Sequence, residues 1–169
     1  MEFKKIQLNG FKSFAEKADF LIEDGLTGIV GPNGCGKSNI VESLRWAMGE
    51  TSAKSMRGSG MEDVIFSGTS NKASKNIAEV TIEVENKDKE GPVQYRDHDQ
   101  IQIKRKIEKD KGSKFYINGK EVRARDAQMF FADLSTGAHS PSIISQGRIG
   151  GLVTAKPTDR RAILEEAAG

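Results

Sequence analysis

The sequence predicts an α/β fold in which a mixed β-sheet surrounds one helix that follows a glycine-rich loop, with a small antiparallel β flank. Three observations lead to this prediction. Several runs alternate between apolar and polar residues, as half-buried strands do. A short apolar run, residues 26–30, leads directly into the glycine-rich loop. From Lys37 onward, apolar residues recur at helical spacing.

The first half of the chain predicts two paired strands, a buried strand and a helix. Apolar and polar residues alternate over 3–8 and again over 18–22 with a short turn between them, which indicates an antiparallel pair. The run at 26–30 is apolar almost throughout, which indicates a buried central strand. Residues 37–48 carry one apolar face, and Gly49 is a suitable C-terminal stop for the helix.

The second half predicts a long loop, further strands and a helix. Residues 51–76 are rich in Ser, Gly and Lys, and loops of such length are usually functional or disordered. Alternation returns at 78–84 and at 101–107. Asn118-Gly119 favours the tight turn of a hairpin, and residues 126–134 are expected to be helical.

Composition excludes several classes of protein. The 169 residues favour one domain with a substantial core. No stretch approaches the roughly 18 apolar residues of a membrane-spanning helix, so we expect a cytoplasmic protein without membrane contact. The single cysteine, Cys35, excludes an internal disulfide and a cysteine-based zinc site. The net charge of +2 is too small to imply nucleic-acid binding, which would require a local basic patch.

Residues 31–38 match the phosphate-loop pattern G-x-x-x-x-G-K-[ST] at every fixed position. Glycines let backbone N–H groups turn toward a phosphate, and the helix that follows aims its positive end at the same oxygens. Lys37 is expected to reach the β- and γ-phosphates and Ser38 to offer its hydroxyl to Mg²⁺. The candidate nucleotide-binding residues of the loop are Gly31, Pro32, Asn33, Gly34, Cys35, Gly36, Lys37 and Ser38.

The loop by itself does not identify the nucleotide or the reaction. A GTPase would also carry N-K-x-D, and the Asn-Lys pairs that begin at Asn71 and Asn86 lack the final Asp. A complete ATPase needs an apolar strand that ends in Asp, often followed by Glu. The nearest candidate, residues 129–133, is better explained as a core-facing helix, and residues 134–137 depart from the ABC signature. The sequence therefore shows a phosphate cradle without the groups that complete hydrolysis.

Further motifs follow in a fixed order along the whole chain. They are GFKSF at 10–14, the phosphate loop continued to Asn39, AKSMRG at 53–58, DVIF at 63–66, FYING at 115–119, IISQG at 143–147 and RRAILEEAAG at 160–169. Together they resemble the N-terminal region of bacterial SMC (structural maintenance of chromosomes) proteins. The last motif is similar to the point where the SMC head enters its coiled coil.

The resemblance implies an ABC-type ATPase head that is split across the sequence. Residues 1–169 would be its N-terminal lobe, truncated before the coiled coil, and the signature motif, the Mg²⁺-site Asp and the catalytic Glu would lie on an absent C-terminal lobe. The implied function is binding of ATP and Mg²⁺, coupled to head engagement, DNA binding, chromosome condensation and segregation. Implied partners are the C-terminal lobe, a second head in a homodimer, non-specific DNA and accessory subunits, in a nucleoid-associated protein.

The resemblance also gives roles to residues outside the phosphate loop. Gln146 matches the glutamine-loop residue that contacts Mg²⁺ and the attacking water, so Gln146 and Lys37 are the candidate catalytic residues. Lys12 and Ser13 match positions near the nucleotide, and Asp63 matches one near the base. Asn39 and Arg57 are further candidate nucleotide-binding residues. Without the resemblance, the simpler interpretation of these residues is that they are ordinary turn and loop residues.

Three arginines are candidate DNA contacts. Arg57 matches the arginine loop, which the family links to nucleotide and DNA sensing. Residues 122–126 resemble a DNA-facing segment, and on a strand Arg123 and Arg125 would share a face and contact phosphates non-specifically. A solvated edge is the alternative. Lys-Arg-Lys at 104–106 is better explained as solvated surface.

Three other functions stay open. A DNA-repair ATPase of the RecN or RecF type shares the phosphate loop but matches the segments at Arg57 and Gln146 less well. A self-sufficient small P-loop kinase would need lid arginines and a catalytic carboxylate after an apolar strand, which the sequence does not show. A non-catalytic interaction module is the third, because half a site can bind without turnover.

Overall fold

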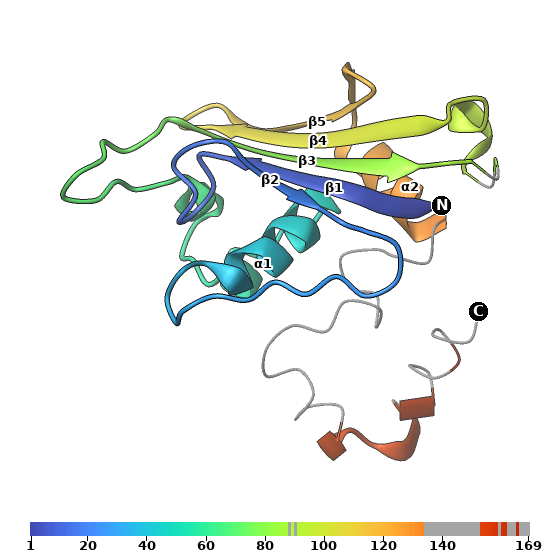
Figure 1. The fold of residues 1–169 in the computed structure, drawn as a ribbon, viewed down its shortest axis with the longest axis horizontal. Coiled ribbons are helices and arrows are strands. Elements are labelled where there is room, and N and C mark those ends of the chain that lie inside the picture. Colours follow the sequence, from blue (N-terminus) through green and yellow to red (C-terminus); the bar gives the residue numbers. More distant parts are fainter. Residues whose placement is uncertain (88, 90, 134–152, 159, 162–164, 166–169) are drawn as a thin grey trace.

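The computed structural model describes residues 1–87, 89, 91–133, 153–158, 160–161 and 165. Six strands form one antiparallel sheet in the order β2-β1-β3-β4-β5-β6 (Figure 1). The strands are β1 (Glu2–Asn9), β2 (Ala18–Leu21), β3 (Ile77–Glu85), β4 (Gln100–Glu108), β5 (Gly112–Ile117) and β6 (Lys120–Val122). The helices are α1 (Lys37–Ala47) and α2 (Ala124–Asp133), with short 3₁₀ turns at η1 (Lys54–Met56), η2 (Met61–Val64) and η3 (Val93–Tyr95). None of the described helices is long and apolar enough to cross a membrane.

Both helices cover the same face of the sheet. Helix α1 packs against β3 and β4, and α2 packs against β5 (Figure 1). Alternate residues of the strands turn toward the helices, as the period of two requires, and form one core with Trp46 of α1 and with Phe130 and Phe131 of α2. The predicted α/β class is therefore confirmed, and so is the interpretation of residues 129–133 as a core-facing helix.

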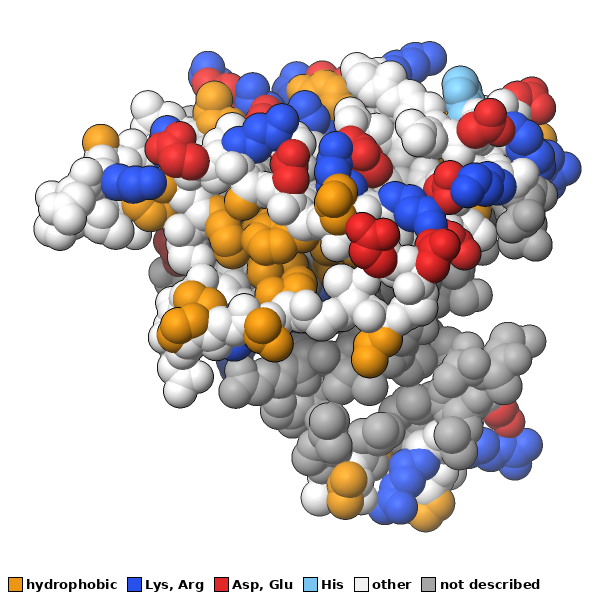
Figure 2. All heavy atoms as spheres, viewed as in Figure 1, with side chains coloured by type: hydrophobic (Ala, Val, Ile, Leu, Met, Phe, Trp, Pro, Cys, Tyr) orange, Lys and Arg blue, Asp and Glu red, His pale blue; other side chains and the backbone are white. Residues whose placement is uncertain are grey.

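The sheet is antiparallel rather than mixed, because the strand predicted at residues 26–30 does not form. This run is an exposed loop between β2 and α1, with Leu26 and Val30 98% and 94% exposed. A strand needs a hydrogen-bonded neighbour, and in the described part of the chain β2 ends the sheet and pairs with β1 alone. The prediction of a buried central strand is wrong for this reason. Figure 2 shows apolar side chains gathered on the face of the molecule that is turned toward the viewer.

The local turn predictions are confirmed. Asn118 and Gly119 have φ of +49° and +79°, as the tight hairpin turn between β5 and β6 requires. Helix α1 ends one residue before Met48, and Gly49 follows with φ of +107°. Gln128 of α2 donates to the Gly49 carbonyl at 3.0 Å, so the end of α1 is bonded to α2.

We expect Gly49→Ala to lower the free energy of unfolding by more than the roughly 1–2 kcal/mol that a left-handed backbone costs a residue with a side chain. A Cβ at this position would lie 2.4 Å from Cγ of Gln128. Urea unfolding measures the change. The matched control is Gly112→Ala, whose φ is +79° but whose added Cβ meets nothing within 4 Å. Equal losses in the two variants would contradict the expected clash with α2.

Arg105 is buried, which corrects its interpretation as solvated surface. It lies on the core-facing side of β4, 4% exposed, with its guanidinium carbon 4.5 Å from the Trp46 ring centroid and 4.7 Å from that of Phe115. Its Nη1 donates to the carbonyls of Trp46 and Glu50, both at 2.7 Å. Burial lowers the pKa of Arg105 to about 10, with Glu50 opposing the shift, so the group stays charged at neutral pH. Arg105 thus fastens the C-terminal end of α1 to the sheet.

Candidate nucleotide site

The phosphate loop is an exposed turn that leads directly into α1. Gly34 and Gly36 have φ of +83° and +97°, a region that favours glycine. A Cβ at Gly36 would lie only 2.4 Å from Oγ of Ser13, so a larger residue does not fit there. Because α1 begins at Lys37, the unpaired N–H groups of its first turn face the loop. The predicted helix after the motif is confirmed, whereas the segment before it is a loop.

Lys37 folds back over the phosphate loop. Its Nζ donates to the carbonyls of Gly31 and Pro32, both at 2.6 Å, and lies 3.8 Å from Sγ of Cys35. The ammonium is therefore held at the loop by neutral oxygens. Cys35 is exposed, within reach of reagents in solvent.

A second group of charges lies beside the first turns of α1, and its centre is Glu42. The Glu42 carboxylate accepts a hydrogen bond from Nζ of Lys12 through one oxygen and forms an ion pair with Nε of Arg57 through the other. Nη2 of Arg57 donates to Oδ1 of Asn39 at 2.8 Å, and Nδ2 of Asn39 donates to Oγ of Ser13 at 2.8 Å. Four residues predicted to lie near the nucleotide, Lys12, Ser13, Asn39 and Arg57, therefore belong to one network of hydrogen bonds and ion pairs.

Two motifs that are distant in the sequence bring this network together. Phe11 pairs with Ile65, and the backbone N–H of Lys12 donates to the Val64 carbonyl at 2.7 Å. The segment 10–14 therefore lies against the segment 63–66. Nζ of Lys12 also donates to the carbonyl of Met56, the residue before Arg57.

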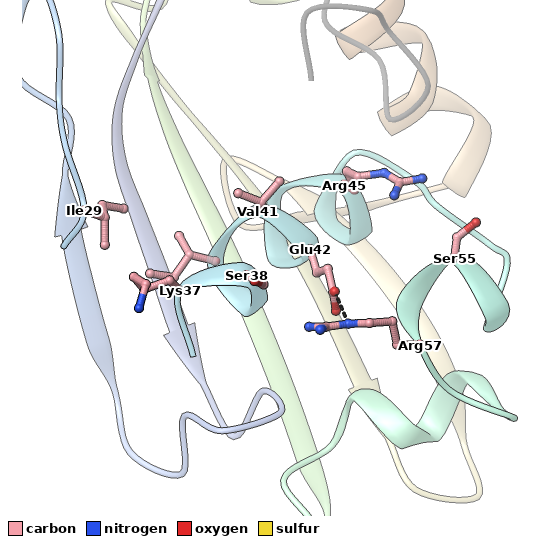
Figure 3. A pocket seen from close by; sticks show the side chains of 9 residues that line it. Ile29, Lys37, Ser38, Val41, Glu42, Arg45, Ser55 and Arg57 are labelled. Carbon is pink, nitrogen blue, oxygen red and sulfur yellow. Dashed lines mark ion pairs between the residues drawn. The ribbon is translucent and has the colours of Figure 1, made fainter. Parts of the chain in front are cut away.

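A pocket beside α1 joins the phosphate loop to this network (Figure 3). Its lining is Ile29, Lys37, Ser38, Ile40, Val41, Glu42, Arg45, Ser55 and Arg57. In Figure 3 the guanidinium of Arg57 extends from its own segment toward the first turns of α1, where Ser38 lies, with Glu42 directly against it. Sequence reasoning missed Glu42. The available signal was its place one helical turn after Ser38, on the same face of α1.

Asp63 has structural partners. Its carboxylate accepts from the backbone N–H of Gly60 at 2.9 Å and from the N–H and hydroxyl of Ser59 at 2.6 and 2.9 Å. The Gly60 bond, followed by the two Ser59 bonds, lowers the pKa of Asp63 below its usual value. The carboxylate thus closes the turn before η2. Its contact with a base stays a prediction.

Arg123 and Arg125 do not line the pocket beside α1. Strand β6 ends at Val122, so Arg123 precedes α2 and Arg125 lies in the first turn of that helix. The argument that both share the face of a strand is therefore wrong, because neither residue lies on a strand. Both side chains are exposed, and their contact with DNA stays a prediction. Gln146 lies outside the described residues.

Comparison with known sequences finds one family. The sequence profile of the RecF/RecN/SMC N terminal domain matches residues 2–147. Chromosome partition protein Smc of Rhodopseudomonas palustris is 55% identical over the whole chain, which covers 15% of that protein. Chromosome partition protein Smc of Cereibacter sphaeroides is 56% identical with the same coverage.

Solved structures agree with the sequences. An SmcHead bound to the C-winged helix domain of ScpA has a TM-score of 0.92 and 32% identity, and the match covers 100% of this chain and 51% of that one. A structure from work on ATP-driven dimerization and DNA-stimulated activation of SMC ATPases has a TM-score of 0.88 and 32% identity, and the match covers 99% of both chains. The SMC head domain of Thermotoga maritima has a TM-score of 0.73 and 33% identity, with 92% and 52% coverage.

Proposed function

This chain belongs to the RecF/RecN/SMC family, and we propose on that premise that it is the N-terminal, ATP-binding lobe of the ATPase head of a chromosome-organising SMC protein. The chain spans about 15% of the length of the curated Smc relatives. Identity of 55% and 56% with proteins named Smc, over all 169 residues of this chain, favours this function over that of a RecN or RecF DNA-repair ATPase. We extend the proposal to the activity and the partners of the whole protein.

The observation that carries the proposal is that several cationic side chains lie beside the glycine-rich phosphate loop at the start of α1. The open space beside Gly34, where a Cβ would meet nothing within 4 Å, leaves room for close approach of a phosphate to the backbone. Lys37 would exchange two carbonyl partners for the charged oxygens of a polyphosphate. Ser38 would offer its hydroxyl to Mg²⁺, which neutralises phosphate charge when bound. Arg57 and Lys12 add positive charge beside the same turn.

The site lacks the groups that complete hydrolysis within the described residues. Residues 129–133 belong to α2, with Phe130 and Phe131 in the core, so they do not supply a strand-end carboxylate. The exposed apolar run at 26–30 supports docking of a C-terminal lobe there. We place the remaining catalytic groups on that lobe and on a second head, and Gln146 beside Mg²⁺. An accessory subunit of the ScpA kind and non-specific DNA complete the assembly.

Protection of Cys35 tests the proposed site. In the full-length protein we expect Mg²⁺ with ATP to slow maleimide labelling of Cys35 several-fold, because the thiol belongs to the exposed loop that would surround the phosphates. Mass spectrometry against time measures the rate. Lys37→Ala is the matched control and should remove the protection. Equal labelling of the wild type with and without saturating ATP would contradict nucleotide binding at this loop.

Arg123→Ala combined with Arg125→Ala should weaken DNA binding by the full-length protein without changing ATP affinity. Loss of two phosphate contacts would reduce the slope of log affinity against log salt by about 2. Fluorescence anisotropy at several salt concentrations measures it. Lys87→Ala with Lys89→Ala, in the connection between β3 and β4, is the control pair. An unchanged slope in the arginine variant would show that this segment does not contact DNA.

A further inference from the structure

We propose that Glu42 is a positioning residue, which orients the guanidinium of Arg57 toward phosphates held by Lys37 and Ser38. Glu42 lies outside the phosphate-loop motif, and no sequence motif indicates a role for it. The inference rests on the proposed nucleotide binding and deepens it, because it explains how an arginine from a separate segment is aimed at the phosphate loop.

The contacts that Arg57 makes with the described residues leave one edge of its guanidinium for a ligand. Glu42 forms an ion pair at Nε, and Asn39 accepts a hydrogen bond from Nη2. Both partners lie on α1, so they fix the plane of the guanidinium against that helix. The side chain nevertheless remains 56% exposed, and it lines the same pocket as Lys37 and Ser38 (Figure 3). A guanidinium that is held on one edge and open to solvent on the other is preorganised to bind an anion.

The Glu42 carboxylate is itself held in place. Lys12 binds its second oxygen and the Met56 carbonyl, and the residue is only 8% exposed. The carboxylate therefore cannot turn away from Arg57 without leaving Lys12.

The backbone supports the same interpretation. Arg57 and Lys12 have φ of +55° and +48°, in the left-handed region that residues with side chains rarely adopt. Such conformations persist where the surrounding structure requires them, and they gather at functional sites. Of the five non-glycine residues with positive φ in the described part of the chain, two are the cations that Glu42 joins.

A simple charge argument predicts the opposite effect of removing Glu42. A carboxylate near a polyphosphate repels it, so Glu42→Gln would tighten nucleotide binding if charge alone mattered. If Glu42 acts by orienting Arg57, the same change weakens binding, and only while Arg57 is present. The sign and its dependence on Arg57 therefore separate the two accounts.

The experiment is a double-mutant cycle of Glu42→Gln and Arg57→Ala in the full-length protein, with the dissociation constant for Mg²⁺–ATP as readout. We expect Glu42→Gln to weaken binding about tenfold, the size of one charge-assisted hydrogen bond, and less than about twofold when Arg57 is already Ala. Glu83→Gln, which removes a lysine-paired carboxylate on β3, is the matched control and should leave the constant unchanged.

The outcomes are distinct. Tighter binding, no change, or an equal loss in both backgrounds would overturn the positioning role. Binding in the wild type that does not depend on Lys37 would instead overturn the proposed function. If Glu42→Gln fails to fold, Arg57→Lys replaces it, because lysine keeps the charge but lacks the planar guanidinium that Glu42 and Asn39 orient. We then expect Arg57→Lys to weaken binding about as much as Arg57→Ala, and wild-type affinity in Arg57→Lys would contradict the proposal.

Discussion

We expect Lys37→Ala in the full-length protein to weaken ATP binding by at least about 100-fold and to abolish hydrolysis. Two charge-assisted contacts to phosphate oxygens at roughly 1.5 kcal/mol or more each account for that factor. In the structure the ammonium bridges the Gly31 and Pro32 carbonyls, and its removal would leave bound phosphates facing those oxygens. Titration with a fluorescent ATP analogue measures the change.

The fold should not depend on Lys37. Its described partners are backbone oxygens and a thiol of an exposed loop, so its loss should leave the melting temperature almost unchanged. Lys17→Ala, at an exposed lysine outside the phosphate loop, is the control and should bind ATP as the wild type does. Unimpaired ATP binding by folded Lys37→Ala protein would place the nucleotide elsewhere.

Arg105→Ala should have the largest effect on stability, a loss of about 3 kcal/mol or more in the free energy of unfolding. The change removes packing against Trp46 and Phe115. It also removes the donor that Arg105 provides to the Trp46 and Glu50 carbonyls at the end of α1. Urea unfolding followed by circular dichroism measures the loss.

The neighbouring lysine provides the control. Lys104 turns to the opposite face of β4 and is half-buried, so Lys104→Ala should change the free energy by less than about 0.5 kcal/mol. Arg105→Lys keeps a cation without the planar fork and should fall between the two. A loss of under about 1 kcal/mol in Arg105→Ala would show that Arg105 does not fasten α1 to the sheet.

Local sequence patterns were sufficient for most of the fold. The strands and α1 could be predicted because the periods of two and of 3.6 are set by side chains that share one face. The same rule places Arg105 on the inward face of β4, with Ile101, Ile103 and Ile107. Its charge led instead to the prediction that it is exposed to solvent. The rings of Trp46 and Phe115 that stack on it come from distant parts of the sequence, so a local pattern does not reveal them.

Other features depend on partners that a local pattern does not contain. The run at 26–30 is apolar, but a strand also needs a hydrogen-bonded neighbour. The phosphate loop could be predicted because phosphate binding itself requires glycines, a lysine and a serine at this fixed spacing. The network around Glu42 could not, because Lys12, Asn39 and Arg57 meet only when the segment 10–14 lies against 63–66.

Steady-state ATP hydrolysis tests most directly the claim that this chain holds one half of an ATPase site. The rate is compared between residues 1–169 alone and the same residues joined to the proposed C-terminal lobe. We predict no turnover above the Lys37→Ala background for residues 1–169 alone, and Lys37-dependent turnover for the joined lobes. Multiple turnover by residues 1–169 alone that Lys37→Ala abolishes would contradict the claim.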